Sequence, residues 1–254
     1  MEFCKLKENQ KLKEAVSIQY QEKIDALNDQ IKFKQEISDL RLKALRSQMN
    51  PHFIFNSLNS IKLYIINNEK ENAVYYLNKF AKLIRKILEA SMVKEISLKE
   101  ELETSELYMN IENIRFSNEI DYSLDIDPKV NISTIKVPSL ILQPFLENAL
   151  WHGLSSKEGD KKITIVIRPI NRNSVRICIE DNGIGRAASA KINNQKFTKG
   201  KSLGITITKD RLADFSKAYT SDFKIAIKDI RDKEKKVAGT QVIIDVPTEK
   251  KISD

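Results

Sequence analysis

Glycine is absent from the first 152 residues of this 254-residue chain. All seven glycines come later, at Gly153, Gly159, Gly183, Gly185, Gly200, Gly204 and Gly239. The glycine-free part has only four prolines to interrupt it, Pro51, Pro128, Pro138 and Pro144. So few turn residues predict a mostly helical first part, and the Val- and Ile-rich remainder predicts strands and loops. The change near residue 120 therefore predicts an α+β fold with a domain boundary at that point.

Composition narrows the class of protein. Lys and Arg number 43 against 35 Asp and Glu, a net charge of +8, and 41% of the residues are hydrophobic. The basic residues alternate with acidic ones along the predicted helices, so we expect a solvated surface and no direct nucleic-acid binding. No apolar run reaches the roughly 18 to 20 residues that span a bilayer, and the first ten residues lack a signal-peptide core. Two cysteines are too few for a disulfide framework, which favours a reducing, cytoplasmic setting.

The first 46 residues carry a narrow apolar stripe. Its members follow one another mostly at steps of three and four, with one shift of phase: Val16, Tyr20, Ile24, Leu27, Ile31, Phe33, Ile37, Leu40 and Ala44. A stripe this thin predicts a coiled-coil linker helix over residues 1–46, because it buries little surface unless a second helix faces it. One amphipathic helix packed against its own domain is the alternative.

Residues 47–118 are predicted to form a helical dimerisation region. Apolar spacing places its helices at about 53–66, 73–88 and 98–115. The third helix has a capping box, because Ser97 is followed three residues later by Glu100. A few polar residues join the first two helices, which predicts an antiparallel hairpin, and two hairpins from two chains would form a four-helix bundle.

Residues 119–250 are predicted to form a mixed domain. Alternating and Val/Ile-rich runs place strands at about 120–126, 163–168, 175–180, 223–229 and 240–246. One helix is expected after Pro138 and another from Leu203 to about Lys217. The polar stretch 183–202 is too long for an ordinary connection and is predicted to be an irregular, functional loop.

An acidic residue and two glycines directly follow the strand predicted at 175–180, in the order Asp181-Asn182-Gly183-Ile184-Gly185. A carboxylate at this place can accept a hydrogen bond from an exocyclic amine such as that of adenine, and glycines allow backbone to approach a ligand closely. A plain hairpin end has the same pattern, so this motif alone leaves both interpretations open.

The helix predicted after Pro138 carries three polar residues among apolar ones, Glu147, Asn148 and His152. Asn148 and His152 are four residues apart and are expected to share a helical face. An amide oxygen is a suitable Mg²⁺ ligand beside phosphate oxygens. The alternatives are a helix-end hydrogen bond for Asn148 and a hydrogen-bonded core position for His152.

Two further motifs follow. Gly200, Lys201 and Gly204 lie where the last predicted helix begins, and free N–H groups with a neighbouring lysine favour phosphate there. Gly239 and Thr240 precede the last predicted strand. Four such signals in this order predict a nucleotide pocket more strongly than any one of them.

The order of these motifs resembles the GHKL or Bergerat ATP-binding fold, which sensor histidine kinases share with the ninety-kilodalton heat-shock chaperones, MutL and gyrase B. The helical region adds Pro51-His52-Phe53-Ile54-Phe55-Asn56, which resembles the PHFxFN phospho-acceptor box of LytS/YehU-type sensor histidine kinases. The stretches 108–116 and 143–153 also match that family, and the resemblance covers about residues 40–247.

This resemblance implies a two-component sensor histidine kinase that uses ATP and Mg²⁺. His52 would be phosphorylated and would pass the phosphoryl group to an aspartate of a response regulator, of the LytTR type. Asn148 would bind Mg²⁺. The remaining ATP-binding residues implied by the family are Asp181, Gly183, Gly185, Gly200, Lys201, Gly204 and Thr240. Ser202 departs from the family, where many members have glycine.

Several points stay open at this stage. Phe53 rather than an acid follows His52, so proton removal is assigned to Glu147 or His152 by motif. Glu112 and Arg115 either serve the site or form a structural ion pair. A homodimer is expected because the stripe at 16–44 and the hairpin at 53–90 each present an apolar face with too little chain left to cover it. The family implies an upstream membrane-bound sensor, so the chain would be the cytoplasmic portion of an inner-membrane protein. A non-catalytic dimeric scaffold that binds nucleotide is the alternative function.

Overall fold

The computed structural model describes residues 51–194 and 203–251, together with five separate helical residues near the N-terminus: Lys23, Leu27, Ile31, Lys32 and Lys34. The chain divides into two units, Met1–Asn50 and Pro51–Asp254. Apart from those five residues, the coiled coil predicted over 1–46 lies outside the described part. The following paragraphs concern the second unit.

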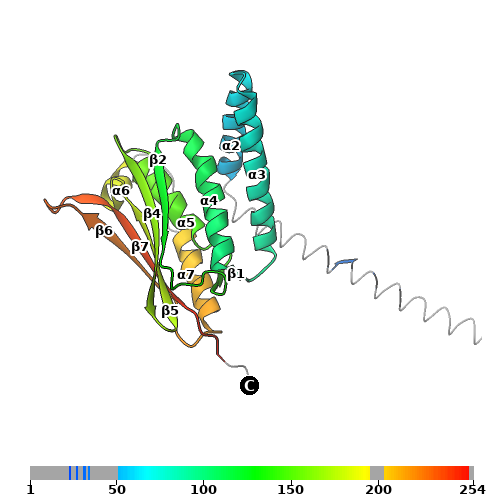
Figure 1. Ribbon diagram of the computed structural model, residues 1–254, viewed down its shortest axis with the longest axis vertical. Coiled ribbons are helices and arrows are strands. Elements are labelled where there is room, and N and C mark those ends of the chain that lie inside the picture. Colours follow the sequence, from blue (N-terminus) through cyan, green and yellow to red (C-terminus); the bar gives the residue numbers. More distant parts are fainter. Residues whose placement is uncertain are drawn as a thin grey trace, which may run out of the picture. The chain divides into compact units, whose positions relative to one another are not determined.

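A helical hairpin opens the second unit. Helix α2 spans Pro51–Ile66 and α3 spans Lys70–Ser91, and the two run antiparallel side by side (Figure 1). Proline suits the first position of α2 because that position needs no N–H donor. Asn68, at φ +64°, forms the tight connection, in which Glu69 N donates to Tyr64 O at 2.8 Å. The predicted hairpin is therefore confirmed.

Helix α4, Leu98–Arg115, starts at the predicted capping box. The Ser97 hydroxyl accepts from Glu100 N at 3.2 Å, and Ser97 N donates to Glu100 Oε2 at 2.8 Å. The short strand β1, Glu95–Ser97, pairs antiparallel with β3, Lys136–Pro138, just before this helix. Along its length α4 contacts α3 on one side and α5 on another, so it links the hairpin to the domain that follows.

That domain contains a five-stranded mixed sheet. The strands are β2 (Ile120–Ile126), β4 (Lys161–Asn171), β5 (Ser174–Asp181), β6 (Lys224–Arg231) and β7 (Val237–Pro247). Their order is β2-β4-β5-β7-β6, with β2 parallel to β4 and all other pairs antiparallel. Alternate residues of the central strands are buried and form the core: Ile163, Ile165, Ile167, Ile177, Ile179, Val242 and Ile244.

One face of the sheet is covered by helices. Helix α5, Gln143–Asn148, continues directly into a π-helix, η1, Ala149–Leu154, and η1 contacts β4, β5 and β7. We call α5 and η1 together the N-box helix. Helix α7, Leu203–Ser216, lies on the same side of the sheet (Figure 1). The expected α+β arrangement, helices followed by a mixed sheet, is thereby confirmed.

Three details differ from the sequence expectations. The stretch 183–202 is not irregular throughout, because α6 spans Arg186–Asn194, where three alanines favour helix. The N-box helix widens to a π-helix at Ala149, which α-helical periodicity did not predict. Gly239 lies inside β7 rather than before it, since that strand begins at Val237.

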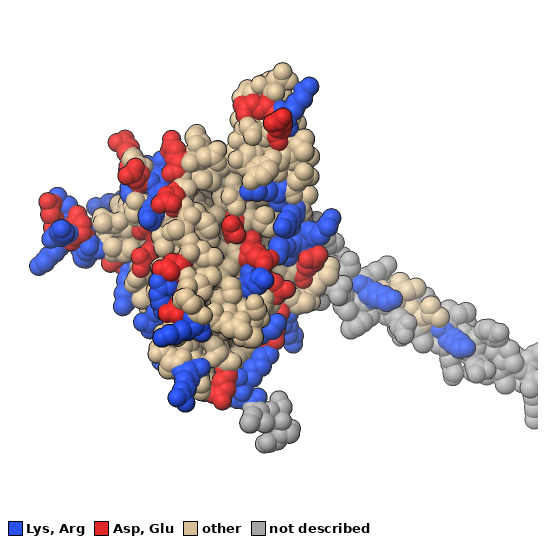
Figure 2. Space-filling model, in the orientation of Figure 1, with Lys and Arg blue, Asp and Glu red and all other residues tan. Residues whose placement is uncertain are grey.

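The surface carries both charge signs in close mixture. Figure 2 shows Lys and Arg interspersed with Asp and Glu over the visible face of the described residues. Examples of the resulting ion pairs are Lys161–Glu119 at 2.8 Å and Arg176–Asp245 at 2.7 Å. Among the residues that the structure describes, no helix is both long and apolar enough to cross a membrane.

Candidate functional site

The site is centred on the buried carboxylate of Asp181, the last residue of β5, which is 6% exposed. Gly183 N donates to its Oδ1 at 2.9 Å, and Thr240, its register partner on β7, bonds to it through both the backbone N–H and the hydroxyl. Burial raises the pKa of Asp181 to about 6, while these donors and the charge of Lys157 act in the opposite direction. Asp181 is thus a fixed hydrogen-bond acceptor in a partly desolvated place.

The N-box helix meets the loop after β5 at Gly153. A Cβ on Gly153 would lie 2.9 Å from Asp181 Oδ1, and a Cβ on Gly183 would lie 2.5 Å from the backbone of Gly153. Ile184 N donates to Gly153 O at 3.1 Å across the same junction. The sequence predicted that Gly183 allows the backbone to approach a ligand closely. The geometry shows that it first allows two backbone segments to touch.

The third segment at the site is the start of β7. A Cβ on Gly239 would lie 2.0 Å from Asp181 O, and Gly185, at φ +79°, faces Val237, whose Cγ1 would be 2.2 Å from a Cβ there. Glycine is needed at Gly185 for its left-handed backbone as well as for space. The structure therefore brings Asp181, Gly183, Gly185 and Thr240 together, as the sequence predicted.

The π-helix sets which residue of the N-box helix reaches this site. Ser155 N donates to Leu150 O at 2.9 Å, a five-residue ladder step. Asn148, the last residue of α5, and His152, within η1, are both half-buried. The common face predicted for them stays a prediction, because their spacing crosses from α5 into the wider turn of η1. Gly153 is the residue that the wider turn brings against Asp181.

Glu147 faces α4. Its Oε1 accepts from Gln143 Nε2 at 3.1 Å, and burial raises its pKa despite that hydrogen bond. The neighbouring Glu112 on α4 is fully buried, and its pKa is raised to about 7, chiefly by burial and further by the charge of Glu147. Glu112 pairs with Arg115 at 3.4 Å, so the ion pair left open by the sequence is present.

The other predicted residues are only partly placed. His52 is the second residue of α2, and its side chain lies outside the described part. Gly200 and Lys201 also lie outside the described residues, whereas Gly204 is the second residue of α7. Of the three residues predicted to bind phosphate, the structure therefore describes only the backbone of Gly204, in the first turn of α7.

Two family models match the chain. The model described as histidine kinase matches residues 40–120, and the model described as histidine kinase-, DNA gyrase B-, and HSP90-like ATPase matches residues 135–250. They follow one another in the order of the PHFxFN box and the nucleotide motifs. The chain belongs to the LytS/YehU-type histidine kinases.

Two curated relatives of this histidine kinase carry corresponding names, and a third, YwpD, is called a putative uncharacterized protein. Sensor histidine kinase YpdA of Escherichia coli (strain K12) is 36% identical over 57% of this chain and 25% of its own length. Sensor protein LytS of Streptococcus agalactiae (serotype V) is 29% identical over 65% of this chain and 28% of its own length. YwpD of Bacillus subtilis (strain 168) is 30% identical over 69% of this chain and 62% of its own length. The chain therefore spans less than two thirds of the length of each of these relatives.

Sequence reasoning missed one charged residue of the site. Lys157, in the loop after η1, donates through Nζ to Asn182 O at 2.6 Å and places a positive charge near Asp181. Asn182 in turn fixes the loop, since its side chain accepts from Lys162 N at 2.8 Å and donates to Asp160 O at 3.0 Å. Lys157 belongs to no motif, so nothing in the sequence distinguishes it from other surface lysines.

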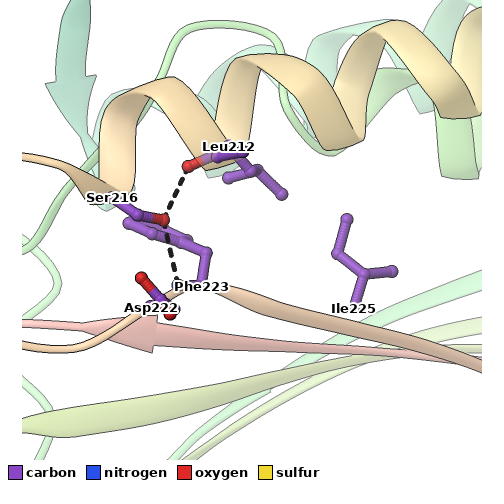
Figure 3. Close-up of a pocket in the computed structure, with 6 residues that line it drawn as sticks. Leu212, Ser216, Asp222, Phe223 and Ile225 are labelled. Atoms are coloured by element: carbon purple, nitrogen blue, oxygen red, sulfur yellow. Dashed lines mark hydrogen bonds between the residues drawn. The ribbon is translucent and has the colours of Figure 1, made fainter.

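A separate pocket of about 460 Å³ lies between α7 and β6 of the kinase (Figure 3). Ser216 joins its two walls, because its hydroxyl donates to Leu212 O at 2.7 Å and accepts from Phe223 N at 3.1 Å. None of the predicted nucleotide-binding residues lines this pocket. Within the described ranges, no cluster of three or more His, Cys, Asp or Glu side chains offers a ready metal site.

Proposed function

We propose that this chain is the kinase portion of a two-component sensor, which transfers the γ-phosphoryl group of ATP to His52 and then to an aspartate of a response regulator. The observation that carries the proposal is the presence of two sites in one folded unit. The PHFxFN box opens α2, and the buried Asp181 acceptor is surrounded by the glycines of the ATPase motifs.

The Asp181 site fits a nucleotide. Its buried carboxylate has acceptor capacity left over for the exocyclic amine of adenine, and Gly183, Gly185 and Thr240 shape the surrounding wall. We assign the phosphates to Gly200, Lys201 and Gly204, because a helix N-terminus with a nearby lysine attracts anions.

Mg²⁺ has one candidate protein ligand, Asn148. Its amide oxygen suits a cation that keeps most of its waters and shares phosphate oxygens, so a large cluster of acids is not required. When bound, the ion would supply charge neutralisation at the phosphates. Asn148 ends α5 immediately before the π-helix whose Gly153 touches Asp181, which is consistent with a place beside the nucleotide.

The protein's own contribution to phosphoryl transfer is mainly positioning. A neutral imidazole at His52 is already a nucleophile near pH 7, and the reaction needs little covalent help from other groups. Glu147 and His152 are the proposed proton acceptors. Glu147 has the more suitable chemistry, because burial raises its pKa toward the working pH, where a base is most effective.

We further propose that two chains pair through the hairpin. Large apolar side chains are exposed along it: Phe55, Leu58, Leu63, Ile65, Ile66, Val74 and Leu77. A second hairpin would cover them in a four-helix bundle. In this arrangement residues 1–46 form the coiled-coil linker, 47–118 the dimerisation and phospho-acceptor region, and 119–250 the ATP-binding domain. An upstream membrane sensor and a LytTR-type regulator complete the proposal.

The test uses labelled ATP. The wild-type chain should acquire acid-labile phosphate, His52→Gln should acquire none while still binding ATP, and Asp181→Asn should lose both. Acid-labile label that persists in the His52 variant would refute the phospho-acceptor. A wild-type chain that binds ATP without ever becoming labelled would favour the dimeric scaffold instead.

A further inference from the structure

The interface between α4 and the N-box helix is unusually polar for the interior of a protein. Four residues of α4, spaced by three or four, are at most 4% exposed: Glu101, Ser105, Tyr108 and Glu112. Opposite them the N-box helix presents three residues spaced by four: Gln143, Glu147 and Trp151. We call these seven residues the polar seam. Packed helices normally bury apolar stripes, whereas here Glu101 of α4 accepts from Leu140 N and Leu142 N, at 2.8 Å each, just before the N-box helix begins.

Tyr108 is the member of the polar seam that also touches the hairpin. Its ring lies 5.2 Å from the ring of Phe53, centroid to centroid, and Phe53 is the residue directly after His52. Phe53 is 4% exposed and also faces Phe80 of α3 at 6.3 Å. Aromatic pairs at such distances have a preferred geometry, so the position of Phe53 in α2 depends on where the Tyr108 ring lies.

The hydroxyl of Tyr108 holds the other helix. It is hydrogen-bonded to the side chain of Trp151, whose indole N–H can only donate. Trp151 is further fixed to α4, because the Arg115 guanidinium lies 4.0 Å from its ring and the Phe116 ring lies at 5.6 Å. Trp151 stands three residues after Asn148 and two before Gly153, the residue that touches Asp181.

We infer that Tyr108 is a positioning residue for phosphoryl transfer, which aligns the helix carrying His52 with the helix carrying Asn148. Its ring fixes the position of α2 through the contact with Phe53, and its hydroxyl fixes the position of the N-box helix through the hydrogen bond with Trp151. This inference rests on the proposed function. It assigns to Tyr108 no contact with ATP, so loss of the hydroxyl should misalign the two helices without removing a nucleotide-binding group.

The experiment replaces Tyr108 by Phe in the full chain, which keeps the ring and deletes only the hydroxyl. The maximal rate of His52 labelling should fall about threefold to tenfold, the change that one ordinary hydrogen bond corresponds to. The KM for ATP should stay within about twofold, since Asp181 and its neighbours are untouched. Tyr219→Phe is the matched control, because its hydroxyl is also buried but has no partner in the described residues.

Trp151→Phe tests the same hydrogen bond from the other side. It should slow labelling as Tyr108→Phe does, and the double variant should be no slower than the slower single variant, because both changes remove one shared interaction. Labelling by Tyr108→Phe at the wild-type rate would overturn the inference, and so would a rise in KM equal to the loss of rate. A wild-type chain that is never labelled would instead overturn the proposed function.

Discussion

Replacing Gly183 by alanine tests whether the site is built on backbone contact. The backbone at Gly183 is not left-handed, so alanine would fit its conformation and would stabilise the chain by about 0.4 to 1 kcal/mol if space were available. The added Cβ would instead lie 2.5 Å from Cα, C and O of Gly153. Carbon atoms in contact normally lie about 3.5 to 4.0 Å apart, so the two segments must separate by about 1 Å.

That separation should be costly because neither neighbour is a side chain that can turn aside. We place the loss near the upper end for overpacking, about 3 kcal/mol, which is roughly 6 to 12 °C in melting temperature for a domain of this size. The hydrogen bond from Ile184 N to Gly153 O spans the same junction and would be strained. ATP affinity should therefore fall together with stability.

Urea unfolding followed by tryptophan fluorescence measures the effect locally. Trp151 is the only tryptophan of the chain and lies two residues before Gly153, so its signal reports on this junction. Gly159→Ala is the control, because Gly159 has φ +77° and nothing lies within 4 Å of a Cβ there. This variant should lose about 1 to 2 kcal/mol of unfolding free energy, the cost of placing alanine in a left-handed backbone conformation. Its affinity for ATP should not change. A Gly183 variant as stable as the wild type would refute the reasoning.

Two further predictions concern charge and assembly. Because burial raises the pKa of Asp181 to about 6, its stabilising contribution is present below about pH 4 and is lost as pH rises through 6. Asp181→Asn should therefore gain about 3 kcal/mol of unfolding free energy relative to the wild type between those pH values, and equal pH profiles in urea titrations would contradict this. Phe55, 68% exposed on α2, should pack in the dimer, so Phe55→Glu should shift sedimentation from dimer to monomer. A variant that remains dimeric would exclude Phe55 from the interface.

The helical part was predictable because its signals are local. The Ser97–Glu100 capping box acts within one turn, and the apolar spacing of α2 and α3 is fixed by the helical repeat itself. The convergence of Asp181, Gly183, Gly185 and Thr240 was also predicted, since the order of motifs along the chain resembles a known fold. The order of the motifs was sufficient for this prediction because β5, which ends at Asp181, pairs in register with β7, which carries Thr240.

What the sequence did not reveal depends on contacts between distant segments. Ala149 to Gly153 has the composition of an ordinary α-helix, and the π-turn occurs where Gly153 O receives Ile184 N from the loop after β5. Tyr108 looks like any aromatic residue of a helix core, because its partners Phe53 and Trp151 are dozens of residues away in opposite directions. No local pattern encodes either arrangement.

The π-turn of η1 has a consequence for the evolution of chain length in this segment. A π-helix can be regarded as an α-helix that has accepted one extra residue. Closing the six residues Ala149–Leu154 into an α-helix of the same length would rotate everything after them by about 100°, the turn of one residue. Gly153 would then turn away from Asp181. Loss of one residue from the segment would offset that rotation, so the π-turn lets the chain carry one extra residue without moving Gly153 away from the site.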